Sequence, residues 1–200
     1  MRPPLVVGIG GTTSPGSATE RILRASLDAA GELGARTRLF AGADLDLPMY
    51  AAGRAGRQPR ARALVEALSE ADGVIVASPA YHGTLSGLVK NALDHAEDLR
   101  LADPPYLEGR AVGCIAVAGG PQAGAATLSA LRAVAHALRG WPTPLGVAVD
   151  TSDRVFGLDG AVDDAVVLCR LDLLAEQVVS FARATARPAP HATPQVAAAL

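Results

Sequence analysis

Several residue classes are scarce in this sequence, and each scarcity excludes a class of protein. Aromatic residues make up 4% of the 200 residues, which leaves few rings for stacking single-stranded nucleic acid. The 18 basic residues are offset by 20 acidic ones and form no long run, so a nucleic-acid-binding face is not expected. Half of the residues are apolar, which is enough for one α/β domain with a full core.

Cysteine and long apolar runs are also scarce. We expect the only two cysteines, Cys114 and Cys169, to be buried thiols of a reducing compartment. No Cys/His/Asp cluster has the spacing of metal ligands, so no metal site is expected. The apolar run at 5–9 is too short for a signal peptide or a membrane span. These features predict a cytoplasmic protein with no membrane association.

Strand and helix patterns alternate along the chain, which predicts a parallel sheet with helices on both faces. The predicted strands are the apolar runs at 5–9, 36–40, 73–78, 111–120 and 143–149. Helical spacing covers about 17–33, 60–71, 86–99, 123–138 and 161–184. Arginines interrupt the second strand, which places it at an edge. Residues 1–184 are expected to form a single domain, and the Pro/Ala-rich segment 185–200 a disordered tail.

Three connecting segments carry the main functional signal. In such a sheet, ligands bind beyond the carboxyl ends of the strands, where the strand order switches. The loops that leave the first, third and fourth strands, 10–19, 79–87 and 118–124, are all rich in Gly, Pro or hydroxyl residues. This coincidence predicts one ligand site shared by the three loops.

The first loop, GTTSPGSATE, is suited to a phosphate group. A helix N-terminus offers unpaired N–H groups, and the hydroxyls add donors without charge. Ser17 and Glu20 match a capping box, with Ser17 as the N-cap and Glu20 reaching back. The alternative is that Ser17 only caps the helix and the rest is an ordinary polar turn. Thr13 stands where the dinucleotide fingerprint needs its third Gly, and the P-loop Lys is absent, so a monophosphate fits better than a pyrophosphate.

The second loop is suited to a planar ring. Pro79 stiffens the backbone, Gly83 permits close approach, and Tyr81 offers an aromatic face. Taken singly, Tyr81 can be a half-buried surface aromatic and His82 a solvated loop residue. No Ser/His/Asp triad is evident among the remaining residues.

Three motifs together make the chain similar to the NADPH-dependent FMN reductase family, whose fold is flavodoxin-like. They are the hydroxyl-rich loop at 11–19, the run SPAYHGTLSGLVKNALD at 78–94, and AGGP at 118–121. The resemblance covers roughly residues 5–150 and implies a three-layer sandwich around a five-stranded parallel sheet. The second motif is the most specific of the three.

The resemblance also implies roles for individual residues. The FMN phosphate would be held by Thr12, Ser14, Ser17 and Thr19. The isoalloxazine ring would be wrapped by Pro79, Ala80, Tyr81, His82, Gly83 and Thr84, and its other edge closed by Gly119, Gly120 and Gln122. Many family members carry an Arg at the position of Ser14, and its absence implies weaker phosphate affinity, an exchangeable FMN, or another ligand. The helix with Lys90 and Asp94 would lie near the interface of a homodimer or homotetramer, unless the two are simply a solvent-facing pair.

The implied activity is hydride transfer from NADPH or NADH to FMN. The cofactor would carry the chemistry, so no catalytic side chain is expected. The reduced flavin would then supply a partner flavin-dependent monooxygenase or reduce a bound acceptor such as a quinone or xenobiotic. The alternatives are a non-catalytic flavin carrier and, less in keeping with the second motif, a nucleotide-sugar-binding domain. The arginines after the second strand, which we interpret as a solvated face, are Arg54, Arg57, Arg60 and Arg62.

Overall fold

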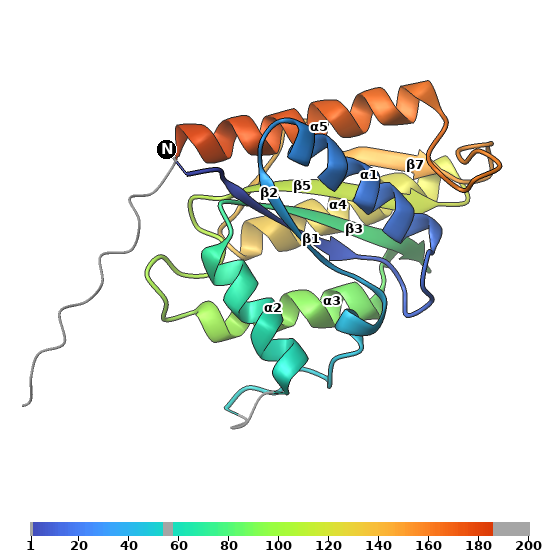
Figure 1. Cartoon of the computed structure of the whole chain (residues 1–200). Helices are drawn as coiled ribbons and strands as arrows, with labels where there is room; N and C mark the ends of the chain where they lie inside the picture. Colours follow the sequence, from blue (N-terminus) through green and yellow to red (C-terminus); the bar gives the residue numbers. More distant parts are fainter. Residues whose placement is uncertain (1, 54–57, 186–200) are drawn as a thin grey trace, which may run out of the picture.

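The structure, a computed structural model, describes residues 2–53 and 58–185, and it is built as three layers (Figure 1). The strands are β1 Leu5–Gly10, β2 Arg36–Phe40, β3 Gly73–Tyr81, β4 Thr84–Leu85, β5 Ala111–Ala118, β6 Trp141–Pro142 and β7 Val147–Asp150. The α-helices are α1 Ala18–Glu32, α2 Pro59–Glu70, α3 Gly87–Asp94, α4 Pro121–Ala137 and α5 Ala165–Ala184. Two 3-10 helices, Gly42–Leu45 and His95–Leu99, complete the described elements.

The sheet has the predicted parallel, doubly wound topology. Its strand order is β2-β1-β3-β5-β6, and β7 also pairs with β5. All of these pairs are parallel, and β2 lies at an edge as its arginines predicted. The chain passes outward from β1 to β2 and then returns to β3 on the other side of β1. The switch in strand order therefore lies between β1 and β3, where ligands bind in such sheets.

The prediction of five strands is wrong in number, because the described sheet has seven. Two of them, β4 and β6, are only two residues long and leave no periodic pattern in the sequence. The predicted strand at 143–149 begins too early, since residues 143–146 lie between β6, which ends at Pro142, and β7, which begins at Val147. Pro144 lies in the break, where it has no N–H to give to a ladder.

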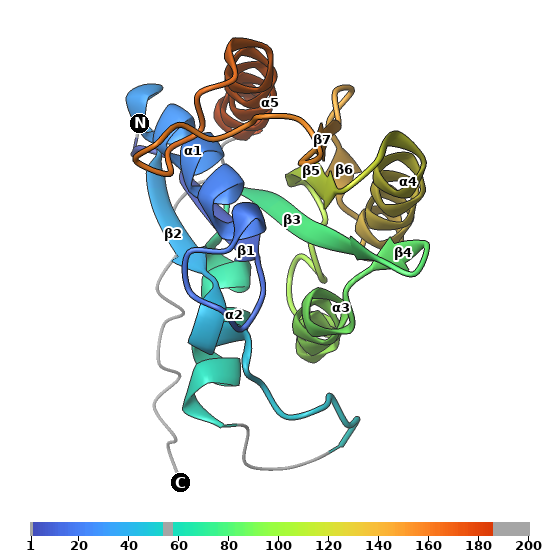
Figure 2. The same cartoon turned by 90° about the vertical axis from the view of Figure 1, so that its right-hand side faces the viewer.

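The two faces of the sheet are covered by different helices (Figure 2). Alternate residues of one strand point to opposite faces. In β3, Ile75 packs in the core beneath α1 and α5, whereas Val74 and Val76 pack in the core beneath α2, α3 and α4. Helix α5 approaches β5 closely, because a Cβ added to Gly113 would lie 2.6 Å from Leu174 Cδ2. Helices therefore cover both faces of the sheet, so a ligand site is expected at the ends of the strands.

Several predicted helix boundaries shift in the structure. The helix expected over 86–99 is α3 followed by a 3-10 turn, and α5 starts at Ala165 instead of residue 161. Asp164 sets that start, because its Oδ1 accepts the N–H groups of Val166 and Val167. Arg54, Arg57 and residues 186–200 of the expected tail lie outside the described residues.

The two cysteines differ, so the expectation that both are buried is half wrong. Cys114 is buried in β5, and burial raises the pKa of its thiol to about 12. Cys169 is exposed on α5. The buried stripe of that helix runs through Leu171, Leu174 and Val178, and Cys169 lies off this stripe. No helix among residues 2–53 and 58–185 is long and apolar enough to cross a membrane.

Candidate functional site

The three loops singled out in the sequence leave adjacent strands at the same edge of the sheet. Gly10 of β1 pairs with Ala77 of β3, and Pro79 of β3 pairs with Val117 of β5. The end of β1 lies so close to β3 that a Cβ at Gly10 would be 2.1 Å from Ala77 O, a space that only glycine fits. The loops therefore begin side by side, as the doubly wound topology requires.

The first loop runs from the end of β1 to the N-terminus of α1, where two backbone N–H donors are unused. Ser17 is the N-cap, as predicted, and its Oγ accepts the N–H of Glu20 at 3.3 Å. The N–H groups of Ala18 and Thr19 precede the first helical hydrogen bond, and no acceptor for them lies among the described residues. Such donors, with the positive end of the helix dipole, are suited to an anion.

Glu20 departs from the usual capping box. Its Oε2 accepts the N–H of Gly16 at 3.0 Å, one residue before the N-cap. Its Oε1 accepts Arg24 Nη2 at 2.7 Å and Arg24 Nε at 3.0 Å. Only 7% of Glu20 is exposed, so a carboxylate and its ion pair lie directly behind the first loop.

The second loop is a tight β-hairpin, which the sequence prediction treated as an open loop. Tyr81 pairs with Thr84 in the antiparallel β3–β4 ladder, and His82 and Gly83 form its two-residue turn. Their φ angles are 49° and 88°, so both lie in the left-handed region that a type I′ turn requires. Glycine is the favoured second residue of that turn, and histidine tolerates the left-handed region better than most residues.

Two buried hydroxyls hold the hairpin in place. Ser78 Oγ accepts the N–H of Ser86 at 2.9 Å and donates to Pro79 O at 2.8 Å. Thr127 Oγ1 on α4 donates to Thr84 O at 3.1 Å. Both hydroxyl residues are fully buried. The hairpin therefore presents a fixed backbone, whose exposed Tyr81 and His82 lie at the site edge of the sheet.

The third loop opens into a groove of about 590 Å³ with the hairpin on its other side. The groove is lined by Gly83, Gly120, Pro121, Gln122, Ala123 and Ala126. A Cβ added to Gly83, Gly119 or Gly120 would meet nothing within 4 Å, so all three glycines face open space. Helix α4 begins here without a side-chain cap, which leaves the N–H groups of Gln122 and Ala123 without acceptors among the described residues.

One carboxylate lies at this edge on the next strand. Asp150 ends β7 and pairs with Ala118, the last residue of β5. Its Oδ1 accepts the hydroxyl of Ser152 at 2.6 Å and the N–H of the same residue at 2.9 Å. These hydrogen bonds, the one from the side chain first, lower the pKa of Asp150 below its ordinary value. Asp150 therefore remains ionised to lower pH than a free aspartate.

The predicted site residues fall into three groups. Gly83, Gly120 and Gln122 line one groove. The hydroxyl residues Thr12, Ser14, Ser17 and Thr19 lie at the neighbouring strand end, where Thr19 is 2% exposed and Ser14 is open to solvent. Pro79 is buried in β3, and Ala80, Thr84 and Gly119 flank the groove without being part of its lining.

Sequence reasoning missed the residues that join α3, the helix after the hairpin, to the segment that follows β2. Asn91 Nδ2 donates to the carbonyls of Leu47 and Pro48, and its Oδ1 accepts the N–H of Tyr50 at 2.8 Å. The buried His95, one turn on, contacts Pro48 O through Nε2 at 3.1 Å. The spacing of Asn91 and His95 at i, i+4 was the available signal.

Lys90 and Asp94 do form the i, i+4 ion pair that their spacing suggested. The distance from Lys90 Nζ to Asp94 Oδ1 is 2.5 Å, and both side chains are nearly half exposed. The pair therefore lies on the solvent side of α3 in the described chain, which agrees with the interpretation of the two residues as a solvent-facing pair. Its place near a subunit interface stays a prediction.

Comparison with solved structures places the fold among flavodoxin-like proteins. FerB, a flavoenzyme NAD(P)H:(acceptor) oxidoreductase from Paracoccus denitrificans, has a TM-score of 0.75 at 19% identity, covering 91% of this chain and 98% of its own. A flavodoxin of Streptococcus pneumonia TIGR4 has a TM-score of 0.60 at 17% identity, covering 88% of this chain and 98% of its own. At these identities the likeness concerns the fold alone.

Sequence comparison gives a narrower result. An FMN-dependent NADPH-azoreductase of Staphylococcus aureus is 35% identical over 120 residues, which is 59% of this chain and 60% of that protein. The match thus spans less than two thirds of the relative's length. The model of the NADPH-dependent FMN reductase family matches residues 4–153, which include all three loops of the site. The resemblance seen in the sequence is confirmed: this chain belongs to the NADPH-dependent FMN reductase family.

Proposed function

We propose that this protein binds FMN at the edge formed by β1, β3 and β5 and uses NAD(P)H to reduce it. The observation that carries the proposal is the set of backbone donors left unpaired at two helix N-termini of that edge, in α1 and in α4. The first N–H groups of a helix have no acceptor within the helix, and two such N-termini at the ligand edge of one sheet provide donors for an anionic or polar ligand.

The residues present fit this cofactor. The N–H groups of Ala18 and Thr19, with the hydroxyls of Thr12 and Ser17, would hold the phosphate. The glycines on either side of the groove leave room for a flat ring, because none of them has a neighbour within 4 Å of an added Cβ. The uncapped N–H groups of Gln122 and Ala123 would donate to the polar edge of the ring, where donors stabilise negative charge.

When bound, FMN supplies the redox chemistry, accepting a hydride from the nicotinamide and passing electrons on. The chain itself would act by binding and orientation. The hairpin would orient the ring, and the open groove beside Gly83 and Gly120 would leave room for the nicotinamide or an acceptor to approach it. The related Staphylococcus aureus protein is an FMN-dependent NADPH-azoreductase, which supports a small aromatic acceptor for this chain as well.

The test is the loss of NADPH absorbance with purified protein, with FMN and with riboflavin in parallel. We expect FMN-dependent oxidation of NADPH, faster than with riboflavin at equal low flavin concentration, because only FMN uses the first loop. Replacing NADPH by NADH then gives the donor preference. Quenching of FMN fluorescence without NADPH oxidation would favour the non-catalytic flavin carrier, and no binding of either flavin would refute the flavin site.

Two fates of the electrons belong to this proposal. The protein would either release reduced flavin to a flavin-dependent monooxygenase or retain it and bind a quinone, azo or other xenobiotic acceptor beside it. Stopped-flow mixing of the reduced protein with an azo dye separates them. Dye reduction at a rate independent of added free FMN means a bound flavin, and a rate proportional to free FMN means release. Light scattering of the same sample tests the expected homodimer or homotetramer.

A further inference from the structure

If the first loop holds a phosphate, no positively charged side chain within the loop balances the charge of that phosphate. Residues 11–19 contain no lysine or arginine, so no cation lies within the loop itself. Directly behind it is the carboxylate of Glu20, 7% exposed and hydrogen bonded to Gly16 N–H at 3.0 Å. A carboxylate in this place opposes a second anion, since like charges a few ångströms apart repel strongly at a partly buried site.

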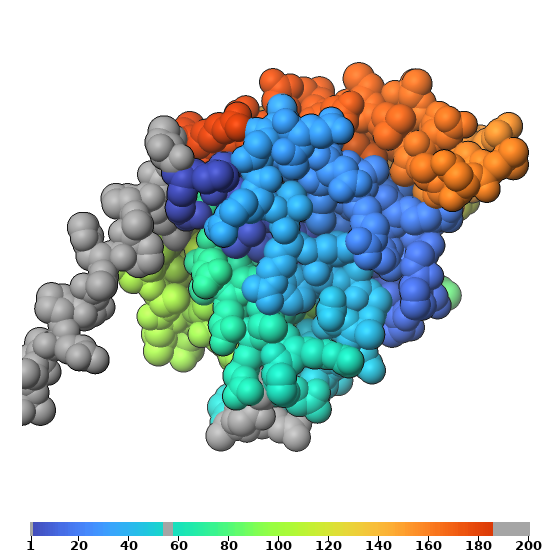
Figure 3. All heavy atoms as spheres, in the orientation of Figure 1, coloured from blue at the N-terminus to red at the C-terminus, as the bar shows by residue number. Residues whose placement is uncertain are grey.

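Two arginines follow on α1, and only one of them serves this loop. Arg21 is committed elsewhere: its guanidinium stacks on Phe156 at 3.8 Å, and its Nη1 donates to Gly160 O at 2.9 Å. Both of these partners lie in the segment after β7, which Figure 3 shows in orange beside the blue start of α1. Arg21 therefore ties two segments of the fold together and is not available to an anion at residues 11–17.

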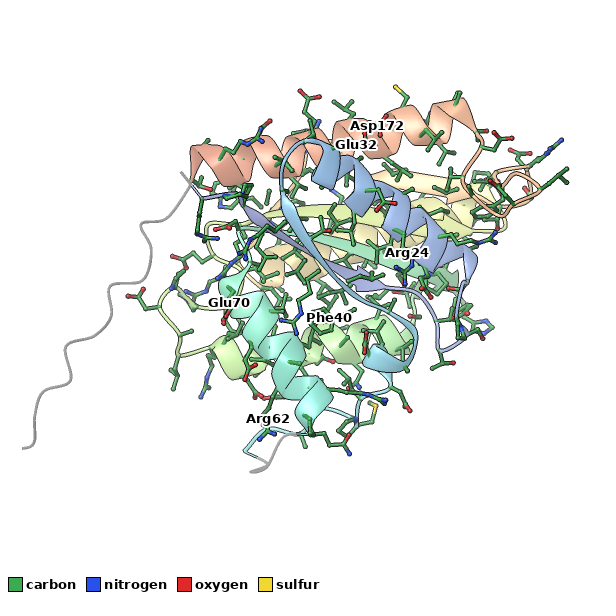
Figure 4. All side chains as sticks on the ribbon, in the orientation of Figure 1. Arg24, Glu32, Phe40, Arg62, Glu70 and Asp172 are labelled. Atoms are coloured by element: carbon green, nitrogen blue, oxygen red, sulfur yellow. The ribbon has the colours of Figure 1, made fainter. Side chains whose placement is uncertain are left out.

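Arg24 lies one turn further on and is aimed back at the loop. Helical side chains tilt toward the N-terminus, so Arg24 reaches Glu20, and its guanidinium lies against the carboxylate that accepts the N–H of Gly16. Figure 4 shows Arg24 in the half of α1 nearer the loop, whereas Glu32 lies at the opposite end of the helix near Asp172 of α5. Only one carboxylate group separates Gly16 from Arg24. The Nη1 atom of Arg24 has no acceptor among the described residues, and its side chain is 58% exposed.

We propose that the Glu20–Arg24 ion pair determines how strongly the site distinguishes a phosphorylated flavin from an unphosphorylated one. This inference rests on the proposed function. Arg24 supplies the positive charge that the loop lacks, and Glu20 both positions Gly16 and opposes the phosphate. The two side chains therefore act in opposite directions on FMN affinity, and neither acts on riboflavin, which carries no phosphate.

The test compares the dissociation constants of FMN and riboflavin, measured by fluorescence quenching, in R24Q, R24K and E20Q. We expect R24Q to weaken FMN binding about 5- to 10-fold with riboflavin changed less than about twofold, as befits a partly exposed charge. R24K, which keeps the charge, should restore most of the FMN affinity. E20Q should strengthen FMN binding by a similar factor, because it removes the opposing negative charge. Glutamine still offers an oxygen to the N–H of Gly16, so the loop should keep its conformation.

The matched control is R139Q. Arg139 is in the exposed pair with Glu108, its side chain is 57% exposed, and it precedes β6 at the opposite edge of the sheet. Its removal changes the net charge equally and should leave both affinities unchanged. Equal losses for the two flavins in R24Q or E20Q would mean that the pair only supports the fold, and an unchanged ratio would likewise overturn the inference. If the wild-type protein binds neither flavin, the proposed function itself fails.

Discussion

The two edges of the sheet differ in whether their polar groups have hydrogen-bond partners within the protein. At the amino edge, just before β5, the side chain of Arg110 is 2% exposed and donates to three carbonyls, those of Ala71, Tyr106 and Ser69. Asp72, before β3, accepts both Leu5 N–H and Arg2 at 2.8 Å. At the carboxyl edge, the N–H groups of Ala18 and Thr19 in α1, and of Gln122 and Ala123 in α4, have no acceptors among the described residues.

This difference in pairing predicts which polar groups contribute to stability and which contribute to ligand binding. Where a polar group has an internal partner, its removal leaves the other partner buried and unsatisfied, which destabilises the fold. Where a donor is unpaired, its removal costs the fold little and removes a contact that only a ligand would make. We therefore expect variants at the amino edge to change the free energy of unfolding, and variants at the carboxyl edge to change ligand affinity.

The largest effect is expected for Arg110→Ala. The variant removes a buried guanidinium and leaves three carbonyl acceptors unpaired, so the free energy of unfolding should fall by about 3–5 kcal/mol. Urea denaturation followed by circular dichroism measures it. Arg110→Met, which keeps much of the apolar length, should lose less. Flavin affinity of the folded fraction should not change, and a loss of affinity without a loss of stability would break the distinction between the edges.

The next effect is expected for Ser17→Asp. Aspartate caps a helix as well as serine does, so stability should be retained. Its charge faces the loop donors, and two unit charges about 5 Å apart at an effective dielectric constant of about 20 interact by about 3 kcal/mol, so FMN affinity should fall on the order of 100-fold. Ser17→Asn is the uncharged control of the same size. Riboflavin affinity should follow the control, and a parallel loss for both flavins would contradict the phosphate assignment.

A smaller effect is expected for Gly83→Ala, because Gly83 contributes both to the stability of the hairpin turn and to the groove. Gly83 has a φ of 88° and lines the groove. Gly83→Ala should cost about 1 kcal/mol of stability through the left-handed backbone alone, since its Cβ would meet no neighbour. The same methyl group enters the groove, so flavin affinity should also fall. His82→Gly relieves the strain at the adjacent residue and should be neutral or stabilising. If Gly83→Ala stabilised the protein, the type I′ turn would be wrong.

The smallest effect is expected for Ser152→Ala. Because the pKa of Asp150 is lowered in the folded state, its contribution to stability is present above its unfolded pKa of about 3.9 and is lost as the pH falls through the folded value. The variant loses the hydroxyl donor, so it should unfold at a slightly higher pH on acidification and match the wild type at the lowest pH. Acid titrations followed by tryptophan fluorescence measure this. In an Asp150→Asn background the same change should have no pH-dependent effect.

The parts of the fold that could be predicted are those with a repeating pattern. Continuous apolar runs located β1, β3 and β5, and the arginines of β2 placed it at the edge. The two-residue strands β4 and β6 have no period to read, and the break at Pro144 became evident only from the pairing. The capping role of Ser17 followed from its sequence motif, because capping is local.

Prediction of the site was limited by contacts between segments far apart in the sequence. The hairpin turn at His82 and Gly83 was open to prediction, since a glycine in the second turn position favours type I′, but its short strands hid it. The ties from Thr127 to Thr84 and from Asn91 to Leu47 join segments more than 40 residues apart, and no local pattern contains them. The Glu20–Arg24 pair had the right spacing, but its relation to Gly16 needed the folded loop.

The antiparallel course of α5 has a practical consequence. The helix runs back along the sheet from the edge of the three loops to the edge where β1 begins, and Figure 1 shows the red end of α5 at the left, beside the dark blue start of the described chain. Arg183, near the end of this helix, donates to Leu33 O. Leu5 and Thr185 therefore both lie far from the groove. A linker attached beside either residue would orient the molecule on a surface with the groove and the proposed flavin site toward the solution. In such a film NADPH and a soluble acceptor would reach the proposed site from the solution without passing the tether.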